Sequence, residues 1–249
     1  MKRIETEGMP IQIALRTLRV SEVFVSFQGE GPSGGERAVF LRLAGCNLSC
    51  VWCDSAYTWD WSSFKREEES GDKELGELAS QLDELAQGTC RLLVLTGGEP
   101  LIQQHGLVKL LKLMSTLQPK MRCEVETNGT IVPSVGLAAF VHRFVVSPKL
   151  ANSCIDQRRR IQFDSLREFA SIDKSAFKFV VERPEDFDEI RFICDAAGIP
   201  SEQVWIMPQA RTSDDCLQGL RLMSEYALTE GYNLSSRLHI LLWEDKRGR

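Results

Sequence analysis

The sequence has few histidines, no long apolar run and no excess of positive charge. Only three of the 249 residues are histidines, and they are widely scattered, so a zinc site built from three histidines would need all of them. The longest apolar stretch, near residues 135–141, is far shorter than the roughly 20 residues of a membrane span. The net charge is −5, whereas proteins that gain their affinity from nucleic-acid phosphates are usually basic.

The composition also lacks the marks of a secreted or a disordered chain. Residues 1–20 have no apolar core like that of a signal peptide. Apolar residues make up 43% and charged residues 26% of the chain, which is ordinary for a globular protein. We therefore expect a cytoplasmic protein of one or two domains that binds neither nucleic acid nor membrane.

Short apolar runs alternate with helical periodicities along most of the chain. Between the runs, apolar residues recur at helical spacing, as at Leu75, Leu78, Leu82 and Leu85. This alternation predicts an α/β fold with a mostly parallel sheet. Six strands are too few for a complete eight-stranded barrel, so a partial barrel or an open sheet is expected. The expected strands are residues 92–95, 123–126, 144–147, 177–181, 204–207 and 238–242.

Polar or Gly/Pro-rich segments follow four of these runs. They are residues 97–100, 126–129, 147–149 and 207–209. Because the carboxyl ends of parallel strands meet at one edge of a sheet, these segments predict a shared site. Polar loops without any site are the alternative.

The first part of the chain has a different pattern. Residues 23–27 and 38–43 are typical of two strands, and the turn between them holds Gly29, Gly31 and Gly34. These glycines match the G-x-G-x-x-G spacing of dinucleotide-binding loops, but that motif needs a helix directly after the glycines. Here a strand pattern follows, so we interpret the segment as a β-hairpin.

Three of the eight cysteines lie close together, and they are the main chemical signal. Cys46, Cys50 and Cys53 form C-x3-C-x2-C. Thiolates suit zinc or iron–sulfur clusters, but a structural zinc site closes with four ligands and no fourth cysteine or histidine is near in sequence. Three thiolates on a four-iron cluster leave one iron open, which is a catalytic arrangement. Buried cysteines on one helix face are the alternative, although the glycine and polar residues between them favour a loop.

Together with Trp52 before the last cysteine, this spacing resembles the signature of the radical S-adenosylmethionine (SAM) enzymes. The segment T-G-G-E-P at residues 96–100 resembles the motif with which these enzymes bind the amino group of SAM. The resemblance implies a partial (βα)6 barrel with an N-terminal hairpin, a [4Fe–4S] cluster on the three cysteines, and SAM on the open iron. It also implies an electron donor such as flavodoxin or ferredoxin, whose electron splits SAM to a 5′-deoxyadenosyl radical.

Further motifs resemble a narrower family, the 7-carboxy-7-deazaguanine synthases. The resemblance covers about residues 20–248, so we expect an N-terminal extension at 1–19 and a single radical SAM domain at 20–249. Residues 246–249 depart from the proline-ended C-terminus of some members. The motifs are S-F-Q-G-E-G at 26–31, F-L-R-L-A-G-C at 40–46, C-V-W-C-D-S at 50–55, T-W-D at 58–60, E-T-N-G at 126–129, S-P-K at 147–149 and R-L-H at 237–239.

This narrower resemblance implies a carbon–nitrogen lyase of queuosine-type 7-deazapurine biosynthesis. Such an enzyme contracts the ring of 6-carboxy-5,6,7,8-tetrahydropterin to 7-carboxy-7-deazaguanine and releases ammonia. The family implies Mg²⁺ as a further cofactor, and a homodimer. Two alternatives are an activase that places a radical on a glycine of a partner protein, and a non-catalytic module that binds a cluster or zinc.

The resemblance also implies roles for individual residues. Arg42 stands mid-strand among apolar residues, where its planar guanidinium suits the substrate carboxylate; an internal salt bridge is the alternative. Ser55 would hold Mg²⁺. The expected SAM site comprises Trp52, Cys53, Asp54, Gly98, Ser147, Pro148, Lys149 and Gln209, and the expected pterin site comprises Phe27, Gln28, Gly29, Glu30, Arg42 and Thr96.

Overall fold

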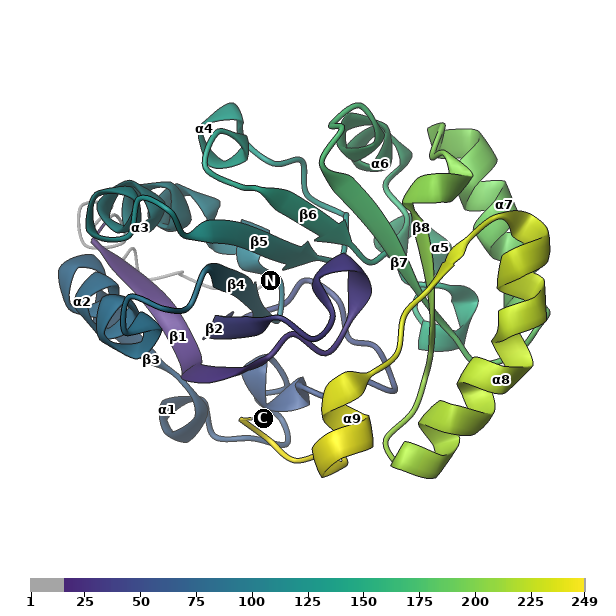
Figure 1. Cartoon of the computed structure of the whole chain (residues 1–249), viewed down its shortest axis with the longest axis horizontal. Helices are drawn as coiled ribbons and strands as arrows, with labels where there is room; N and C mark the ends of the chain where they lie inside the picture. The colour runs from purple at the N-terminus through teal and green to yellow at the C-terminus, as the bar shows by residue number, and fades with distance from the viewer. Residues whose placement is uncertain (1–15, 249) are drawn as a thin grey trace, which may run out of the picture.

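The computed structural model describes residues 16–248, which form one nine-stranded sheet with helices on its outer side (Figure 1). The strands are β1 (Thr17–Phe27), β2 (Arg37–Leu43), β3 (Gly71–Glu74), β4 (Leu92–Gly97), β5 (Arg122–Thr127), β6 (Arg143–Val146), β7 (Ser175–Val181), β8 (Val204–Pro208) and β9 (Asn233–Leu234). The α-helices are α1 (Arg66–Glu69), α2 (Leu75–Ala86), α3 (Gln104–Leu117), α4 (Val135–Ala138), α5 (Gln157–Arg160), α6 (Phe163–Ala170), α7 (Asp186–Ala197), α8 (Ser213–Glu230) and α9 (Leu238–Trp243). Short 3-10 helices are η1 (Gly31–Ser33), η2 (Ala56–Thr58), η3 (Pro100–Gln103), η4 (Ala151–Ser153) and η5 (Ser201–Gln203).

The strand order is β3-β1-β2-β4-β5-β6-β7-β8-β9. β1 runs antiparallel to both of its neighbours, whereas each neighbouring pair from β2 to β9 is parallel. The hairpin, the parallel sheet and the partial barrel that the sequence predicted are therefore confirmed. After the glycine-rich turn comes strand β2 rather than a long helix, which confirms the rejection of a dinucleotide-binding loop.

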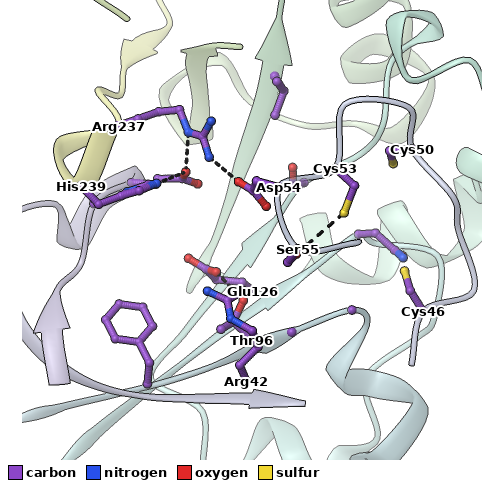
Figure 2. Close-up of a pocket in the computed structure, with 18 of the residues that line it drawn as sticks. Arg42, Cys46, Cys50, Cys53, Asp54, Ser55, Thr96, Glu126, Arg237 and His239 are labelled. Atoms are coloured by element: carbon purple, nitrogen blue, oxygen red, sulfur yellow. Dashed lines mark hydrogen bonds and ion pairs between the residues drawn. The ribbon is translucent and has the colours of Figure 1, made fainter. Parts of the chain in front are cut away.

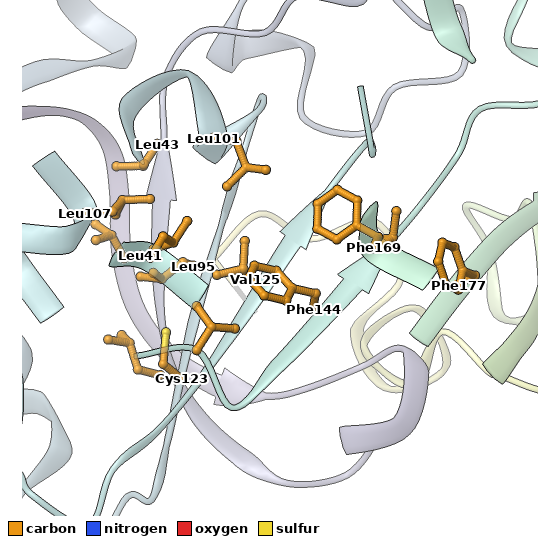
Figure 3. Packing of buried hydrophobic residues seen from close by; sticks show 14 of the residues in the cluster. Leu41, Leu43, Leu95, Leu101, Leu107, Cys123, Val125, Phe144, Phe169 and Phe177 are labelled. Carbon is orange, nitrogen blue, oxygen red and sulfur yellow. The ribbon is translucent and has the colours of Figure 1, made fainter. Parts of the chain in front are cut away.

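The main core lies between the sheet and the helices, because alternate strand residues face outward. Leu41 and Leu95 are fully buried there (Figure 3). The rings of Phe144 and Phe169 meet edge to face with centroids 5.4 Å apart. Full burial of one such side chain contributes about 1.5–3 kcal/mol. The intervening residues, such as Arg42 and Thr96, must point to the inner side of the sheet, where the cavity described below lies.

One expected strand is wrong. Residues 238–242 form helix α9, and the strand at this edge is the short β9. A short apolar run cannot be assigned to helix or strand by periodicity alone. Here a strand would face Leu238, Ile240 and Leu242 to one side, but Ile240 is fully buried whereas Leu242 is 51% exposed. The Leu241 amide donates to the Arg237 carbonyl oxygen (3.0 Å), as in a helix.

The N-terminal strand begins earlier than the motifs indicated. β1 starts at Thr17, and residues 17–20 pair with β3. The boundary between an extension at 1–19 and a domain at 20–249 stays a prediction, and residues 1–15 lie outside the described residues. Among residues 16–248, no helix is both long and apolar enough to cross a membrane.

Candidate active site

A cavity of about 490 Å³ opens at the carboxyl ends of the parallel strands (Figure 2). It collects side chains from the hairpin, the cysteine loop, the ends of β4 to β8 and the C-terminal residues. Pro148 is buried beside it but does not line it. The residues expected from the sequence that do line it are Phe27, Gln28, Gly29, Glu30, Arg42, Cys46, Cys50, Trp52, Cys53, Asp54, Ser55, Thr96, Gly98, Ser147, Lys149 and Gln209.

The three cysteines lie on one loop after β2 rather than on a helix, as Figure 2 shows. Two asparagines fasten this loop to the end of β5, since Asn128 Nδ2 donates to Asn47 Oδ1 (2.9 Å). Gly45, with φ of +95°, starts the loop and donates its amide to the Thr58 carbonyl oxygen (2.7 Å). The prediction of a loop is confirmed, and the contacts of Gly45 and Asn47 anchor its first part.

These thiols fit an iron–sulfur cluster. All three are half-buried and line the same cavity, and thiolates are the ligands such clusters use. Burial raises the pKa of the Cys46 thiol to about 11 and also raises that of Cys50, so binding must displace protons. Within residues 16–248 no three His, Cys, Asp or Glu side chains converge as a single metal ion would need. In a cluster each thiolate binds a different iron, so such convergence is not required.

Trp59 adds a hydrogen bond to this thiol set. Its Nε1 donates to Cys53 Sγ (3.3 Å). Donors to a cluster's sulfur ligands are one of the means by which a protein sets the reduction potential. The sequence analysis included Trp59 in the T-W-D motif at 58–60 but predicted no contact for it.

The Gly97-Gly98-Glu99 segment holds the cysteine loop against the sheet. A Cβ on Gly98 would lie 2.2 Å from the carbonyl oxygen of Gly45, so the loop can approach only because glycine stands there. The Glu99 amide donates to that same oxygen (2.8 Å). The Glu99 carboxylate is fully buried and accepts hydrogen bonds from the Asn128 amide and the Thr127 hydroxyl, while burial raises its pKa. The motif thus joins β4, β5 and the cysteine loop.

An ion-pair network crosses the cavity. Glu30 pairs with Lys178 of β7 and with Arg237 Nε (2.9 Å). Arg237 also pairs with Asp54, as drawn in Figure 2. Burial alone would raise the Glu30 pKa, but Lys178, Arg237 and His239 together hold it well below its usual range. Sequence reasoning did not single out Lys178. Its position within the apolar run of β7 was the available signal, because a cation in a buried strand needs an anion.

Two carboxylates lie beneath the hairpin turn. Gln28 Nε2 donates to Glu124 Oε1 (2.9 Å) and to Glu126 Oε1 (3.0 Å), and the Thr96 hydroxyl donates to Glu126 Oε2 (2.7 Å). The Gln28 side-chain oxygen accepts from the Glu30 amide. The amide of Gln28 is therefore occupied within the protein, and Glu126 is the group of this set that adds a charge to the cavity lining. The sequence analysis noted the segment 126–129 but gave Glu126 no role.

Arg42 forms the internal salt bridge that was the alternative to a role in substrate binding. Its Nε lies 3.1 Å from Glu22 Oε2. Among residues 16–248 this is the hydrogen bond that the guanidinium makes, so its two Nη groups stay free to bind an anion in the cavity. The salt bridge and the substrate role are thus compatible, and the second stays a prediction.

The other half of the cavity carries the expected SAM residues. Lys149 Nζ donates to the Ser147 hydroxyl (3.0 Å) and lies 5.5 Å from the centroid of the Trp52 ring. Trp52 Nε1 donates to Asn152 Oδ1 (3.2 Å), which fixes the ring at the cavity wall. An aromatic face and a cation beside the cysteine loop suit a ligand with an adenine ring and a carboxylate.

The chain is similar in sequence to several known proteins. The profile of the Radical SAM superfamily matches residues 41–141. A 7-carboxy-7-deazaguanine synthase of Pyrobaculum aerophilum is 38% identical, over 93% of this chain and 97% of its own length. The chain belongs to the 7-carboxy-7-deazaguanine synthase family. Another synthase of this name, from Hyperthermus butylicus, is 37% identical over 92% of this chain and 94% of its own.

The fold agrees with that of a solved structure. The crystal structure of QueE from Escherichia coli superposes with a TM-score of 0.67 at 25% identity, and the match covers 94% of this chain and 100% of that chain. As a member of the 7-carboxy-7-deazaguanine synthase family the chain is a radical SAM enzyme, a lyase whose cofactors are a [4Fe–4S] cluster and SAM. The resemblance read from the motifs is confirmed.

Proposed function

We propose that this protein converts 6-carboxy-5,6,7,8-tetrahydropterin to 7-carboxy-7-deazaguanine, with loss of ammonia, in 7-deazapurine biosynthesis. One observation carries the proposal: the three cluster thiols and the free face of Arg42 line the same cavity. The near full-length similarity to proteins named for this product supports the choice of reaction.

Cys46, Cys50 and Cys53 would hold the cluster. Together the cluster and SAM supply the one-electron chemistry that starts hydrogen abstraction from the substrate. The protein binds and orients the substrate and the cofactors, and it excludes water from the site. Around SAM we assign Trp52 to the adenine ring and Ser147, Lys149 and Gln209 to its polar groups. Asp54 and Gly98 complete that wall, and buried Pro148 shapes the loop that carries Lys149.

The substrate half would recognise the pterin by charge and stacking. The two Nη groups of Arg42 suit a bidentate contact with the carboxylate. Glu126, held by Gln28 and Thr96, suits the N–H groups of the pterin ring. Phe27 lies in parallel with Trp243, with centroids 6.3 Å apart, and extends an aromatic surface at the rim. Gly29 and Glu30 complete the wall formed by the hairpin turn.

We assign Ser55 to Mg²⁺. Ser55 is buried and lines the cavity, and its hydroxyl lies 3.8 Å from Cys53 Sγ. The hydroxyl does not cap helix η2 although the residue stands at the capping position. One hydroxyl is a weak site for a hard cation, so substrate oxygens and water would supply the other ligands. Tight Mg²⁺ binding should therefore require the pterin, which isothermal titration with and without 6-carboxypterin would measure.

We also propose a low-potential electron donor such as flavodoxin or ferredoxin, and a homodimer, because the family resemblance implies both. Residues 20–249 would form the single catalytic domain. Size-exclusion chromatography with light scattering tests the dimer, and turnover with each donor in place of dithionite tests the donor.

The reaction is tested by anaerobic reconstitution with iron and sulfide, followed by dithionite, SAM, Mg²⁺ and the carboxytetrahydropterin. Mass spectrometry should detect 7-carboxy-7-deazaguanine and ammonia in equal amounts. Formation of 5′-deoxyadenosine without ring contraction would retain the radical class but overturn the substrate. An activase must admit a polypeptide loop, whereas here residues 245–248 contribute a wall to the cavity.

Arg42→Ala tests the carboxylate contact separately. Loss of one charged hydrogen-bonded partner should raise the KM for the pterin about tenfold or more. Iron content and reductive SAM cleavage without the pterin should stay normal. Unchanged turnover at low pterin concentration would remove Arg42 from the substrate site.

A further inference from the structure

Glu22 does not line the cavity, yet it contacts two cations that do. The β1–β2 register places Glu22 directly opposite Arg42, whose Nε reaches Glu22 Oε2 at 3.1 Å. The other oxygen, Oε1, pairs with Arg247 from the C-terminal residues, 225 positions away. The Arg42 and Glu22 side chains are only 20% and 15% exposed, so solvent screens their pair weakly, whereas the pair with Arg247 is more exposed.

Arg247 is held by three groups from different parts of the chain. Besides Glu22, its Nη1 pairs with Glu69 Oε2 at the end of α1 (2.7 Å). Its guanidinium carbon lies 3.8 Å from the centroid of the Tyr57 ring, a cation–π distance. Tyr57 in turn donates its hydroxyl to Glu22 Oε2 (2.8 Å). These contacts fix residues 245–248, which form part of the cavity wall.

The same contacts constrain Arg42. With Nε bound to Glu22, the guanidinium plane cannot turn without breaking that bond, so the Nη groups keep one direction. Burial opposes the charge of Arg42, but Tyr57, Asp54 and Glu22 outweigh it and raise its pKa. Arg42 is therefore a permanently charged group of fixed orientation.

We propose that Glu22 is a positioning residue that aims Arg42 at the carboxylate of the pterin, and that Arg247 completes this unit by fastening the C-terminal residues over the same end of the cavity. The inference rests on the proposed function, because it takes the ligand of Arg42 to be that carboxylate. Glu22, Arg42 and Arg247 together then determine the preference for a carboxylated over an uncarboxylated pterin.

A purely structural role for the same residues predicts a different result. If Glu22 and Arg247 only stabilised the fold, their loss would lower the affinity for every pterin equally. If they position Arg42, their loss weakens the carboxylated ligand selectively, and the two losses are not additive because both act through one guanidinium.

A binding measurement separates these roles. The fluorescence of 6-carboxypterin and of pterin reports the affinity of each for the reconstituted enzyme with SAM. We expect R247Q and E22Q each to weaken 6-carboxypterin about tenfold, with pterin affinity within twofold of wild type. The double variant should be no weaker than the worse single variant, and R247K should recover part of the loss. R167Q removes an arginine that pairs with Asp164 on α6 and does not line the cavity, and is the matched control.

The outcomes distinguish failure of the positioning role from failure of the proposed function on which it rests. If R42A loses the carboxylate preference but R247Q and E22Q keep it, the positioning role is overturned while the substrate assignment stands. If wild type shows no preference, the carboxylate contact of Arg42 fails, and the positioning role with it. Equal weakening of both pterins by R247Q also overturns the inference.

A ligand-free measurement tests the fastening itself. Hydrogen exchange of the folded enzyme should be faster at residues 245–248 in R247Q than in wild type or R167Q. Unchanged exchange there would overturn the role of Arg247 whatever the substrate. Because Arg247 is 44% exposed, this variant should fold even where E22Q does not, and R247Q alone then decides.

Discussion

The Lys178 ammonium and the Glu30 carboxylate form a buried ion pair although 148 positions separate them in sequence. Lys178 stands in β7, and Glu30 stands in the turn that joins β1 to β2. Arg237, just before α9, pairs with the other oxygen of Glu30. A single carboxylate thus fixes three distant segments around the cavity.

Removal of that carboxylate should be costly. Glu30→Gln leaves Lys178 and Arg237 buried with one anion fewer, and breaking a buried pair on one side typically lowers the free energy of unfolding by about 3 kcal/mol or more. Urea unfolding at pH 7 measures the loss. The control is Glu68→Gln, which removes an exposed pair with Lys65 and should change stability by less than about 1 kcal/mol. A loss of similar size in both variants would contradict the role of Glu30.

The comparison of wild type with Glu30→Gln also predicts how the free energy of unfolding depends on pH. The neighbouring cations hold the Glu30 pKa well below its usual range in the folded state. In the unfolded chain the pKa of a glutamate is about 4.3. The unfolded chain then binds this proton more readily, so the contribution of Glu30 is full above that pH and is lost as the pH falls through the folded pKa. The stability difference between wild type and Glu30→Gln should begin to shrink near about pH 4.3. A difference that is unchanged at about pH 3 would refute the shift.

The cysteine loop makes a sharp prediction. Cys50→Ala should prevent stable cluster assembly, because three thiolates are needed to hold the cluster with one iron open. Iron and sulfide content, the spectrum of the reduced protein and 5′-deoxyadenosine formation should all fall to background. Cys154→Ser changes an exposed thiol and should leave all three unaffected. Normal SAM cleavage by Cys50→Ala would remove this residue from the cluster.

Gly98→Ala tests how the sheet supports the loop. The added methyl would press on the Gly45 carbonyl oxygen, so the cysteine loop must shift away from β4. A misplacement of about 1 Å in a reacting group costs on the order of a hundredfold in rate, so SAM cleavage should fall by about that factor. Gly76→Ala is the control, because open space surrounds this glycine in α2 and alanine should stabilise the helix by about 0.5–1 kcal/mol. Full activity of Gly98→Ala would show that the loop does not depend on this contact.

The parts of the site that the sequence predicted are those that depend on local spacing. The cysteine loop, the glycine-rich segment after β4 and the hairpin turn are each short, contiguous stretches of sequence. Their patterns can therefore be recognised without knowledge of the fold. The strand-end rule then placed Ser147, Lys149 and Gln209 at one edge of the sheet, and all three line the cavity.

What the sequence did not predict depends on partners distant along the chain. Glu22 is opposite Arg42 only through the register of β1 and β2, which a bulge near Val20 alters. Lys178 looks like one cation in an apolar run until β7 is placed beside the hairpin turn. Gln28 lines the cavity and its substrate role stays a prediction, but the two carboxylates of β5 that its side-chain amide contacts could not be predicted from the sequence. Residues 238–242 were misassigned because four apolar residues around His239 fit either period.

The contact between the hairpin turn and the segment before α9 bears on how the chain matures. Gly31 donates its amide to the Ser235 hydroxyl, and the Leu238 amide donates to the Gly29 carbonyl oxygen. During synthesis, residues 28–31 leave the ribosome some two hundred positions before these partners do. Strands β1 to β8 therefore emerge before the catalytic chamber can form, because that chamber exists only after residues 235–248 have emerged, and a stalled nascent chain would carry a cysteine loop open to solvent.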